Sequence, residues 1–128
     1  MLRKVVSLDE GTANFANVEG YDVGGKTGTA VKYKSKAKLN TFVSVFPASR
    51  PKYVLLVMLD EPKSAPNYIY EFPPSEKFPN GYKYKGETRN TSGWNTVVVA
   101  GKIIEKIGPI LAINKNDFYD NHVVKKSD

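Results

Sequence analysis

The stretch G-Y-D-V-G-G-K-T-G-T-A, residues 20–30, holds the side chains of this sequence that are best suited to chemistry. From Gly20 to Thr27 its letters match G-x-x-x-x-G-K-[ST], the spacing of a loop that cradles the phosphates of a nucleotide. Further along, the hydrophobic run Y-V-L-L-V-M-L ends in Asp60, a carboxylate of the kind that holds Mg²⁺. One interpretation is therefore a P-loop nucleotide-binding protein.

The sequence around this match argues against a nucleotide site. A phosphate-binding loop leads into a helix whose N-terminus points at the phosphates, but here G-T-A-V-K-Y-K follows, with glycine and alternating β-branched residues. Residues 47–52 can form only a turn, whereas two parallel strands need a crossover of about a dozen residues. We therefore expect the strand that carries Asp60 to be antiparallel to the strand before it.

The other interpretation takes K-T-G as the centre of a site on a strand at the rim of a cleft. Lys26 offers a positive charge and a proton relay, Thr27 and Thr29 offer hydroxyls, and Gly28 leaves room for a ligand. Because side chains alternate along a strand, Lys26 and Thr27 point to opposite faces, so a site that uses both lies along the strand's edge. Such an edge can also pair with a peptide-like substrate.

Composition narrows the class of protein. The chain has 128 residues, enough for about one domain, with 41% hydrophobic and 25% charged residues, as in soluble globular proteins. It has no cysteine, and its one histidine, His122, has no second histidine with which to form a metal site, so we expect no metal and no cofactor. The net charge of +6 is spread over many lysines, which indicates a solvated surface rather than a nucleic-acid partner.

Three strands are expected from the pattern of β-branched and aromatic residues. The first covers about residues 21–33, and residues 41–47 and 52–62 should form an antiparallel hairpin. Apolar residues run almost without a break from 54 to 59, which favours a central strand covered on both faces.

Two helices flank these strands in the prediction. Residues 2–8 suit a short helix, and residues 97–111 show apolar positions at helical spacing, with Pro109 expected to bend or end that helix. Between strands and helix, residues 61–93 form a proline- and aromatic-rich segment without sustained periodicity, which we interpret as a loop pinned to its own domain by its aromatic rings. Residues 113–128 are a polar tail.

Three stretches of the chain resemble one known family. Residues 2–32, 42–62 and 93–111 closely resemble the C-terminal end of the transpeptidase domain of class B penicillin-binding proteins, and look most like the division-specific septal peptidoglycan D,D-transpeptidase. The most specific element is K-T-G-T-A, preceded by G-Y-x-V-x-G and followed by the D-E-P strand. The resemblance makes residues 1–112 a C-terminal fragment of that domain.

The resemblance implies an α+β fold of the penicillin-binding and serine β-lactamase type, with an antiparallel sheet of at least three strands and a C-terminal helix packed on it. It also implies that Lys26 binds the carboxylate of the peptidoglycan stem peptide or of a β-lactam and tunes the proton network. Thr27 and Thr29 would bind that carboxylate through their hydroxyls. The main-chain N–H of Thr29 would be one of two oxyanion donors, each contributing about 3 kcal/mol.

The family's nucleophile cannot be placed in this sequence. In the family, the serine and its lysine partner lie in S-x-x-K at a helix start upstream of K-T-G, with S-x-N between them. Ser35 with Lys38 and Ser49 with Lys52 spell S-x-x-K, but both pairs follow K-T-G and neither begins a helix, so we interpret both as chance matches. We expect the chain alone to be inactive and not to be labelled covalently by penicillin.

An incomplete domain also has consequences for partners and location. Apolar surface that meets a missing lobe would be exposed, so we expect association with the N-terminal remainder of the domain or with a second copy. The alternative from another class is a non-catalytic module that holds cell-wall polymer or a division partner. The family is periplasmic and anchored in the inner membrane, whereas this sequence shows no signal peptide or membrane segment, so we expect the chain made alone to stay in the cytoplasm.

Overall fold

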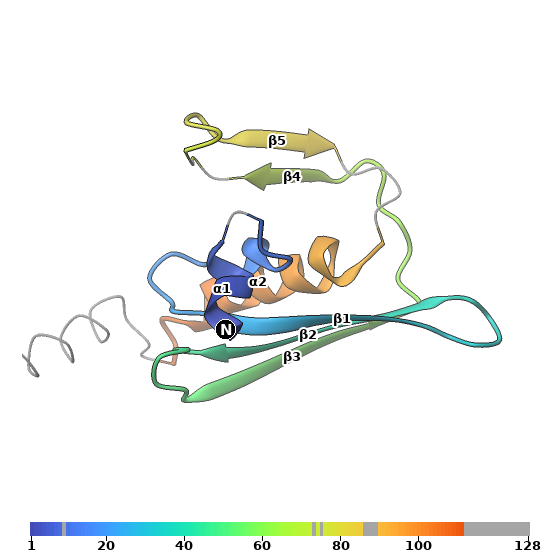
Figure 1. Ribbon diagram of the computed structural model, residues 1–128, viewed down its shortest axis with the longest axis horizontal. Coiled ribbons are helices and arrows are strands. Elements are labelled where there is room, and N and C mark those ends of the chain that lie inside the picture. The colour runs from blue at the N-terminus through green and yellow to red at the C-terminus, as the bar shows by residue number, and fades with distance from the viewer. Residues whose placement is uncertain (9, 73, 75, 86–89, 112–128) are drawn as a thin grey trace, which may run out of the picture.

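The chain is arranged in three tiers in the computed structural model, which describes residues 1–8, 10–72, 74, 76–85 and 90–111 (Figure 1). A three-stranded sheet forms one tier, two helices lie against one of its faces, and a two-stranded hairpin lies beyond the helices. The expected polar tail, residues 113–128, lies outside the described residues.

The large sheet is antiparallel throughout and contains the K-T-G sequence. It consists of β1 (Gly24–Val31), β2 (Lys38–Phe46) and β3 (Tyr53–Asp60), in the order β1-β2-β3. The hairpin of β2 and β3 is therefore confirmed. No helix follows Thr27, because β1 continues as a strand to Val31, so the interpretation of this stretch as a P-loop is wrong.

Two α-helices cover the face of the sheet that carries the core. Helix α1 (Leu2–Ser7) precedes a short 3-10 turn, η1 (Asn14–Ala16), and a second turn, η2 (Ser92–Trp94), leads into α2 (Thr96–Ile107). The Asn95 side chain caps α2 by accepting a hydrogen bond from the Thr96 N–H at 2.6 Å. The helix ends just before Gly108 and Pro109, as the sequence predicts.

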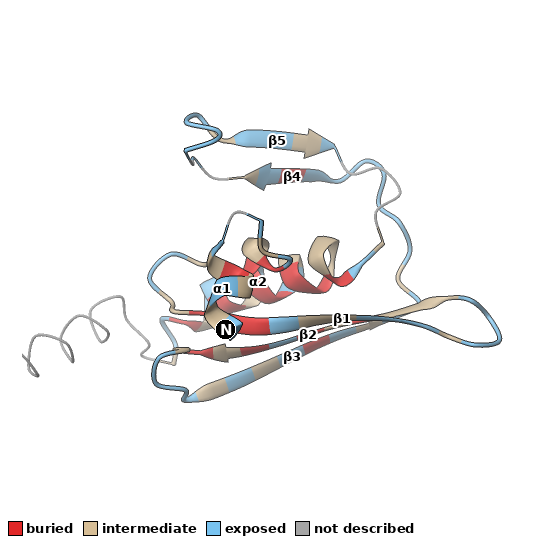
Figure 2. Cartoon of the chain, in the orientation of Figure 1, coloured by how far each residue is buried: buried red, intermediate tan, exposed pale blue. Residues whose placement is uncertain are grey.

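Apolar side chains of α2 and of the sheet interlock to form the core. The buried residues gather between α2 and the strands (Figure 2). Val97, Ala100 and Ile104 of α2 are fully buried against a layer that includes Phe42 and Val57. Gly101 allows the helix to approach η1, because a Cβ there would lie 2.4 Å from the Phe15 carbonyl oxygen.

The opposite face of the sheet is open, which overturns one prediction. The run 54–59 was expected to be covered on both faces, but β3 lies at an edge of the three-stranded sheet and pairs only with β2 there. Alternate side chains of the strand face outward (Figure 2): Val54 is 70% exposed, Leu56 is 56% exposed and Met58 is 54% exposed. Together with Val43 of β2, which is 40% exposed, these three residues form what we call the open face.

Residues 61–93 are not one continuous loop. They contain a hairpin of β4 (Ile69–Phe72) and β5 (Tyr82–Lys85), which pair antiparallel, as well as η2. The Trp94 ring contacts Tyr70, Phe72 and Tyr84 of the hairpin, and Tyr70 also contacts Phe15 of η1. The aromatic rings therefore attach the hairpin to the rest of the domain, as expected. Among the described residues, no helix is both long and apolar enough to cross a membrane.

Candidate active site

The K-T-G residues lie on an edge strand. In the part of the chain that the structure describes, strand β1 has β2 on one side and no further strand of the sheet on the other. The Lys32 N–H donates to the Ala37 carbonyl at 2.8 Å, which fixes the hydrogen-bonded positions of the antiparallel pair. Because these positions alternate, the N–H groups of Thr27 and Thr29 point away from β2, toward the free edge.

The start of β1 is fixed by an ion pair. The Arg3 guanidinium of α1 lies 2.9 Å from a carboxylate oxygen of Asp22 and also donates to the Val23 carbonyl at 3.0 Å. The second Asp22 oxygen accepts the Ser49 N–H at 2.8 Å. Asp22 therefore connects α1 and the turn between β2 and β3 to the segment before β1. These contacts fix the position of the first residues of β1.

Lys26 and Thr27 point to opposite faces of the sheet, as the alternation predicts. Lys26 is exposed and lies opposite Val43, on the same side as the open face. Its Nζ donates to the Thr27 carbonyl at 2.8 Å, and among the described residues no carboxylate lies within ion-pair distance. Since an ammonium has three protons, Lys26 keeps two for a ligand.

The two threonine hydroxyls have different surroundings. The Thr27 Oγ1 lies 3.3 Å from the Oγ1 of Thr12, an exposed residue. The Thr29 Oγ1 lies 3.1 Å from the Oγ of Ser92 and accepts the Ser92 N–H at 3.2 Å. Thr29 is therefore engaged by the turn before α2, whereas Thr27 is held only at the surface.

The absence of a side chain at Gly28 has a reason within the sheet. A Cβ at Gly28 would lie 2.7 Å from the Thr41 Oγ1, and that hydroxyl donates to the Gly28 carbonyl at 3.3 Å. At Gly25, a Cβ would lie 2.6 Å from the ring of Phe42. Close packing against β2 therefore disfavours a side chain at Gly28 and excludes one at Gly25, where the Val43 carbonyl oxygen would also lie only 2.7 Å away.

Residues 90–95 form a clamp that sequence reasoning did not identify. The Asn90 side-chain oxygen accepts from the amides of Asn40 at 3.1 Å and Asn95 at 3.0 Å, while its carbonyl accepts from the Lys38 Nζ at 2.9 Å. Ser92 adds the contacts to β1 and β2. We call residues 90–95 the clamp segment. The S-G-W-N-T letters before an apolar helix are a capping signal, but nothing in them indicates a contact with K-T-G.

One buried polar atom at the clamp segment is not satisfied. Asn40 is fully buried on β2, opposite Thr29 in the register, and its Oδ1 has no hydrogen-bond donor in the part of the chain that the structure describes. Its amide nitrogen is bonded to Asn90. The acceptor therefore carries an unfavourable burial energy at the junction of the sheet and the clamp segment.

The two S-x-x-K matches are not arranged as a nucleophile and its base. Ser35 is exposed in the turn between β1 and β2, and Lys38 is used in its contact with the Asn90 carbonyl. Ser49 and Lys52 are exposed beside the turn that joins β2 to β3. Neither pair lies at a helix start, so both stay interpreted as chance matches. Among the described residues, no group of three or more side chains is placed to bind a metal ion.

Comparison with known proteins identifies the family. Residues 1–75 match the family model of the penicillin binding protein transpeptidase domain. The probable peptidoglycan D,D-transpeptidase FtsI of Caulobacter vibrioides is 31% identical over 126 residues, covering 90% of this chain and 18% of that protein. The peptidoglycan D,D-transpeptidase FtsI homolog of Chlorokybus atmophyticus is 47% identical over 58 residues, covering 41% of this chain and 8% of that protein.

A third relative, penicillin-binding protein PbpB of Mycolicibacterium smegmatis, is 39% identical over 77 residues, which cover 51% of this chain and 12% of that protein. The chain thus spans between 8% and 18% of the length of these three relatives. The family match and the α+β fold agree with the resemblance inferred from the K-T-G region. The chain belongs to the transpeptidase-domain family of penicillin-binding proteins, as a segment of a class B transpeptidase domain.

Proposed function

We propose that this chain supplies the K-T-G wall of a peptidoglycan D,D-transpeptidase, an enzyme that cross-links the cell wall during growth and division. The observation that carries the proposal is the free edge of β1, where Lys26 is exposed and the N–H groups of Thr27 and Thr29 point outward. An edge of this kind can bind an extended peptide through its main chain. The ligand is the peptidoglycan stem peptide, or a β-lactam in its place.

Each K-T-G residue has a separate role in this proposal. Lys26 binds the carboxylate of the ligand with its free protons and tunes the proton network around the nucleophile. Gly28 keeps β1 close to β2, so that the edge stays straight beside the ligand. The main-chain N–H of Thr29 points to the free edge, where it stabilises the oxyanion of the acyl-transfer intermediate.

The nucleophile comes from other polypeptide in this proposal, so the chain alone is inactive. Donors for an oxyanion and contacts for a carboxylate stabilise a reaction only when an attacking group is present. The open face is the surface on which the N-terminal remainder of the domain docks, because its four apolar side chains adjoin Lys26 across the sheet. The cytoplasmic location expected for the chain made alone stays a prediction.

Labelling with fluorescent penicillin tests the proposal. We expect no label on the chain alone, and label on the serine-bearing N-terminal part of the domain only when the two are mixed. Lys26→Ala should lower labelling of the mixture by about tenfold or more, because the carboxylate loses a charged partner. The matched control is Lys34→Ala, since Lys34 is also exposed and lies near the same strand. An unlabelled mixture, or an N-terminal part labelled equally well without this chain, would contradict the proposal.

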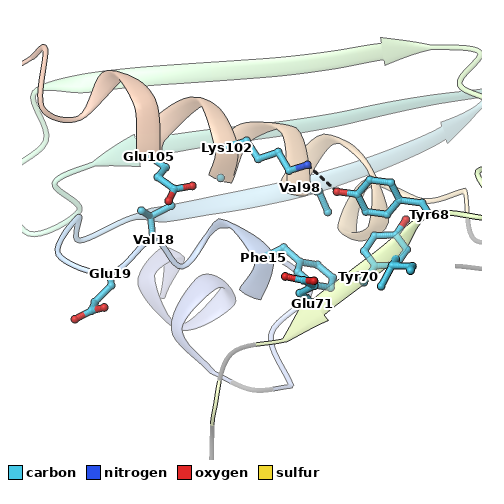
Figure 3. A pocket seen from close by; sticks show the side chains of 11 residues that line it. Phe15, Val18, Glu19, Tyr68, Tyr70, Glu71, Val98, Lys102 and Glu105 are labelled. Carbon is cyan, nitrogen blue, oxygen red and sulfur yellow. Dashed lines mark hydrogen bonds between the residues drawn. The ribbon is translucent and has the colours of Figure 1, made fainter. Parts of the chain in front are cut away.

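A groove beside the hairpin supports a second candidate function, that of a non-catalytic interaction module. Its volume is about 500 Å³, and it lies between the residues around η1, strand β4 and helix α2 (Figure 3). Aromatic and charged side chains line it together: Phe15, Tyr68, Tyr70, Glu19, Glu71, Glu105 and Lys102. The Lys102 Nζ donates to the Tyr68 hydroxyl at 2.8 Å and lies 5.2 Å from the Tyr68 ring centre.

Aromatic residues are enriched at binding surfaces, and Tyr68 is exposed in this groove, so the groove would hold cell-wall polymer or a division partner. Co-sedimentation with purified cell wall tests the candidate. We expect Tyr68→Ser to lower the bound fraction if the groove binds polymer, and Tyr33→Ser, at an exposed tyrosine far from the groove, to leave it unchanged. Binding without any penicillin labelling of the mixture would favour the module over the enzyme segment.

A further inference from the structure

Strand β4 has an unpaired edge that borders the groove beside the hairpin. Among the described residues, β4 pairs only with β5, so the main-chain groups of its other edge are not used by a strand. The successive residues 68–71 all line the groove. Because alternate side chains of a strand point to opposite faces, successive residues line one cavity only along the strand's edge. The edge of β4 therefore forms one wall of the groove (Figure 3).

Helix α2 forms another wall of the groove. Val98, Gly101, Lys102 and Glu105 line it, and their positions i, i+3, i+4 and i+7 lie on one face of the helix. At a rise of about 1.5 Å per residue, this face is about 10 Å long, which equals the length of about three residues of extended chain. The groove, with a volume of about 500 Å³, is therefore long enough for a short extended segment beside β4.

The charges in the groove indicate which kind of segment it accepts. Carboxylates line it at Glu19, Glu71 and Glu105, and all three residues are exposed. The lysine in the lining, Lys102, donates to the Tyr68 hydroxyl. The whole chain has a formal net charge of +6, so the negative charge of the groove runs against that of the rest of the chain. Charge complementarity therefore favours a basic occupant.

We propose that this groove binds an extended basic segment of another protein, which adds a third strand to the hairpin at the edge of β4. Main-chain hydrogen bonds to β4 supply affinity, and lysine or arginine side chains of the segment pair with the carboxylates. The inference rests on the interaction role proposed above for this groove as the second candidate function, and it names the class of partner. Its test needs no transpeptidase activity, because the groove is lined by residues around η1, of β4 and of α2.

Two fluorescent peptides of opposite charge test the choice of partner. One consists of four valine-lysine repeats and the other of four valine-glutamate repeats, so both have the alternation of a strand. Fluorescence anisotropy at low salt should show that the chain binds the basic peptide about tenfold more tightly, or better. Attraction by the net charge of +6 alone would give the opposite order. Equal affinities, or tighter binding of the acidic peptide, would overturn the proposal.

Two N-methylated forms of the basic peptide test the addition of a strand. In one form every valine nitrogen is methylated, and in the other every lysine nitrogen, so each form lacks the N–H donors of one edge of the extended peptide. Since only one edge of the peptide faces β4, one form should bind about tenfold more weakly than the other. Equal affinities of the two forms would exclude main-chain pairing with β4.

The variant Glu105→Gln tests whether the peptide lies in the groove. Glu71 also pairs with Lys83 across the hairpin at 3.0 Å, whereas Glu105 lies on the exposed side of α2, where a substitution should cost little stability. Glu105→Gln should weaken binding of the basic peptide by about two- to fivefold, the value of an exposed ion pair. Glu10→Gln, at an exposed glutamate that does not line the groove, should leave binding unchanged. Equal effects of the two variants would place the peptide elsewhere and overturn the proposal.

The remaining outcomes separate this inference from the functions proposed above. If Tyr68→Ser lowers the binding of cell wall while the unsubstituted chain does not bind the basic peptide, the groove holds polymer and the inference is wrong. A mixture without penicillin labelling would count against the enzyme segment and not against binding of the peptide.

Discussion

The hydroxyl of Ser92 donates to the carbonyl of Gly28, a residue 64 positions earlier in the chain. The same oxygen accepts the Thr41 N–H of the neighbouring strand, so one side chain bridges β1 and β2 where the K-T-G sequence lies. The segment before α2 thereby becomes part of the wall of the candidate site. Any change that moves η2 should therefore also shift the positions of Gly28 and Thr29.

Removing this hydroxyl should destabilise the fold. Ser92→Ala removes the part-buried side-chain contacts that the Ser92 hydroxyl makes with the Thr41 N–H and the Thr29 hydroxyl, at a cost of about 1–3 kcal/mol in the free energy of unfolding. Urea unfolding of the chain measures the change. Ser64→Ala, at an exposed serine, is the control and should change the free energy by less than about 0.5 kcal/mol.

The contact between α2 and η1 should tolerate no added side chain at Gly101. An alanine there would place its Cβ 2.4 Å from the Phe15 carbonyl oxygen, so the helix or the turn must move. We expect Gly101→Ala to lower the unfolding free energy by about 1–3 kcal/mol, although alanine favours a helix. Thermal unfolding measures this, with Glu105→Ala, on the exposed side of α2, as the control. An increase in stability for Gly101→Ala would show that the close approach is absent.

Tyr70 should make the fold sensitive to alkali. Burial raises the pKa of the Tyr70 hydroxyl, with smaller contributions from Tyr68 and Tyr84, and the hydroxyl donates to the Trp94 carbonyl at 2.6 Å. The folded state therefore keeps this proton at a pH where the unfolded chain, with a tyrosine pKa near 10, has lost it. The stabilisation is complete below about pH 10 and is lost as the pH rises through the raised pKa of the folded state.

Tyr70→Phe tests this pH dependence. The variant should be less stable by about 1 kcal/mol near pH 8, because the hydrogen bond is lost, and its stability should fall less steeply above pH 10. The stability of the variant should still fall somewhat above pH 10. Hydrogen bonds to Asp60 and to Tyr68 raise the pKa of Lys32 and of Lys102, respectively, so the folded chain holds these two protons more tightly than the unfolded chain does. Urea unfolding across this pH range gives the slopes, with Tyr33→Phe, at a tyrosine that is 88% exposed, as the control. Equal slopes for Tyr70→Phe and the unsubstituted chain would contradict the prediction.

The elements with strong local patterns could be predicted from the sequence. The alternation around Lys26 identified β1, the short connection at 47–52 required an antiparallel hairpin, and the spacing from Val97 onward gave α2 with its end before Pro109. The hairpin of β4 and β5 was missed, because its strands are short and are held by ring contacts with Trp94 rather than by an apolar period.

Other features depend on contacts that a local pattern cannot contain. The apolar run of β3 matches a strand covered on both faces, but only the face toward α2 is covered within the described residues. The Ser92 contacts join residues far apart in the sequence, so no spacing rule indicates them. The K-T-G letters locate the site, whereas the different neighbours of the Thr27 and Thr29 hydroxyls, Thr12 and Ser92, are known only from the structure.

The open face provides the last prediction, because its apolar side chains should matter for docking and not for folding. Leu56 is 56% exposed on β3, so Leu56→Lys should change the unfolding free energy of the chain by less than about 0.5 kcal/mol. The same variant should lower penicillin labelling of the mixture with the N-terminal part by about tenfold or more, since a buried lysine in the docked state lacks a partner. Tyr33→Lys, at an exposed aromatic residue between β1 and β2, should leave labelling unchanged. Full labelling with Leu56→Lys would place the docking surface elsewhere on the chain.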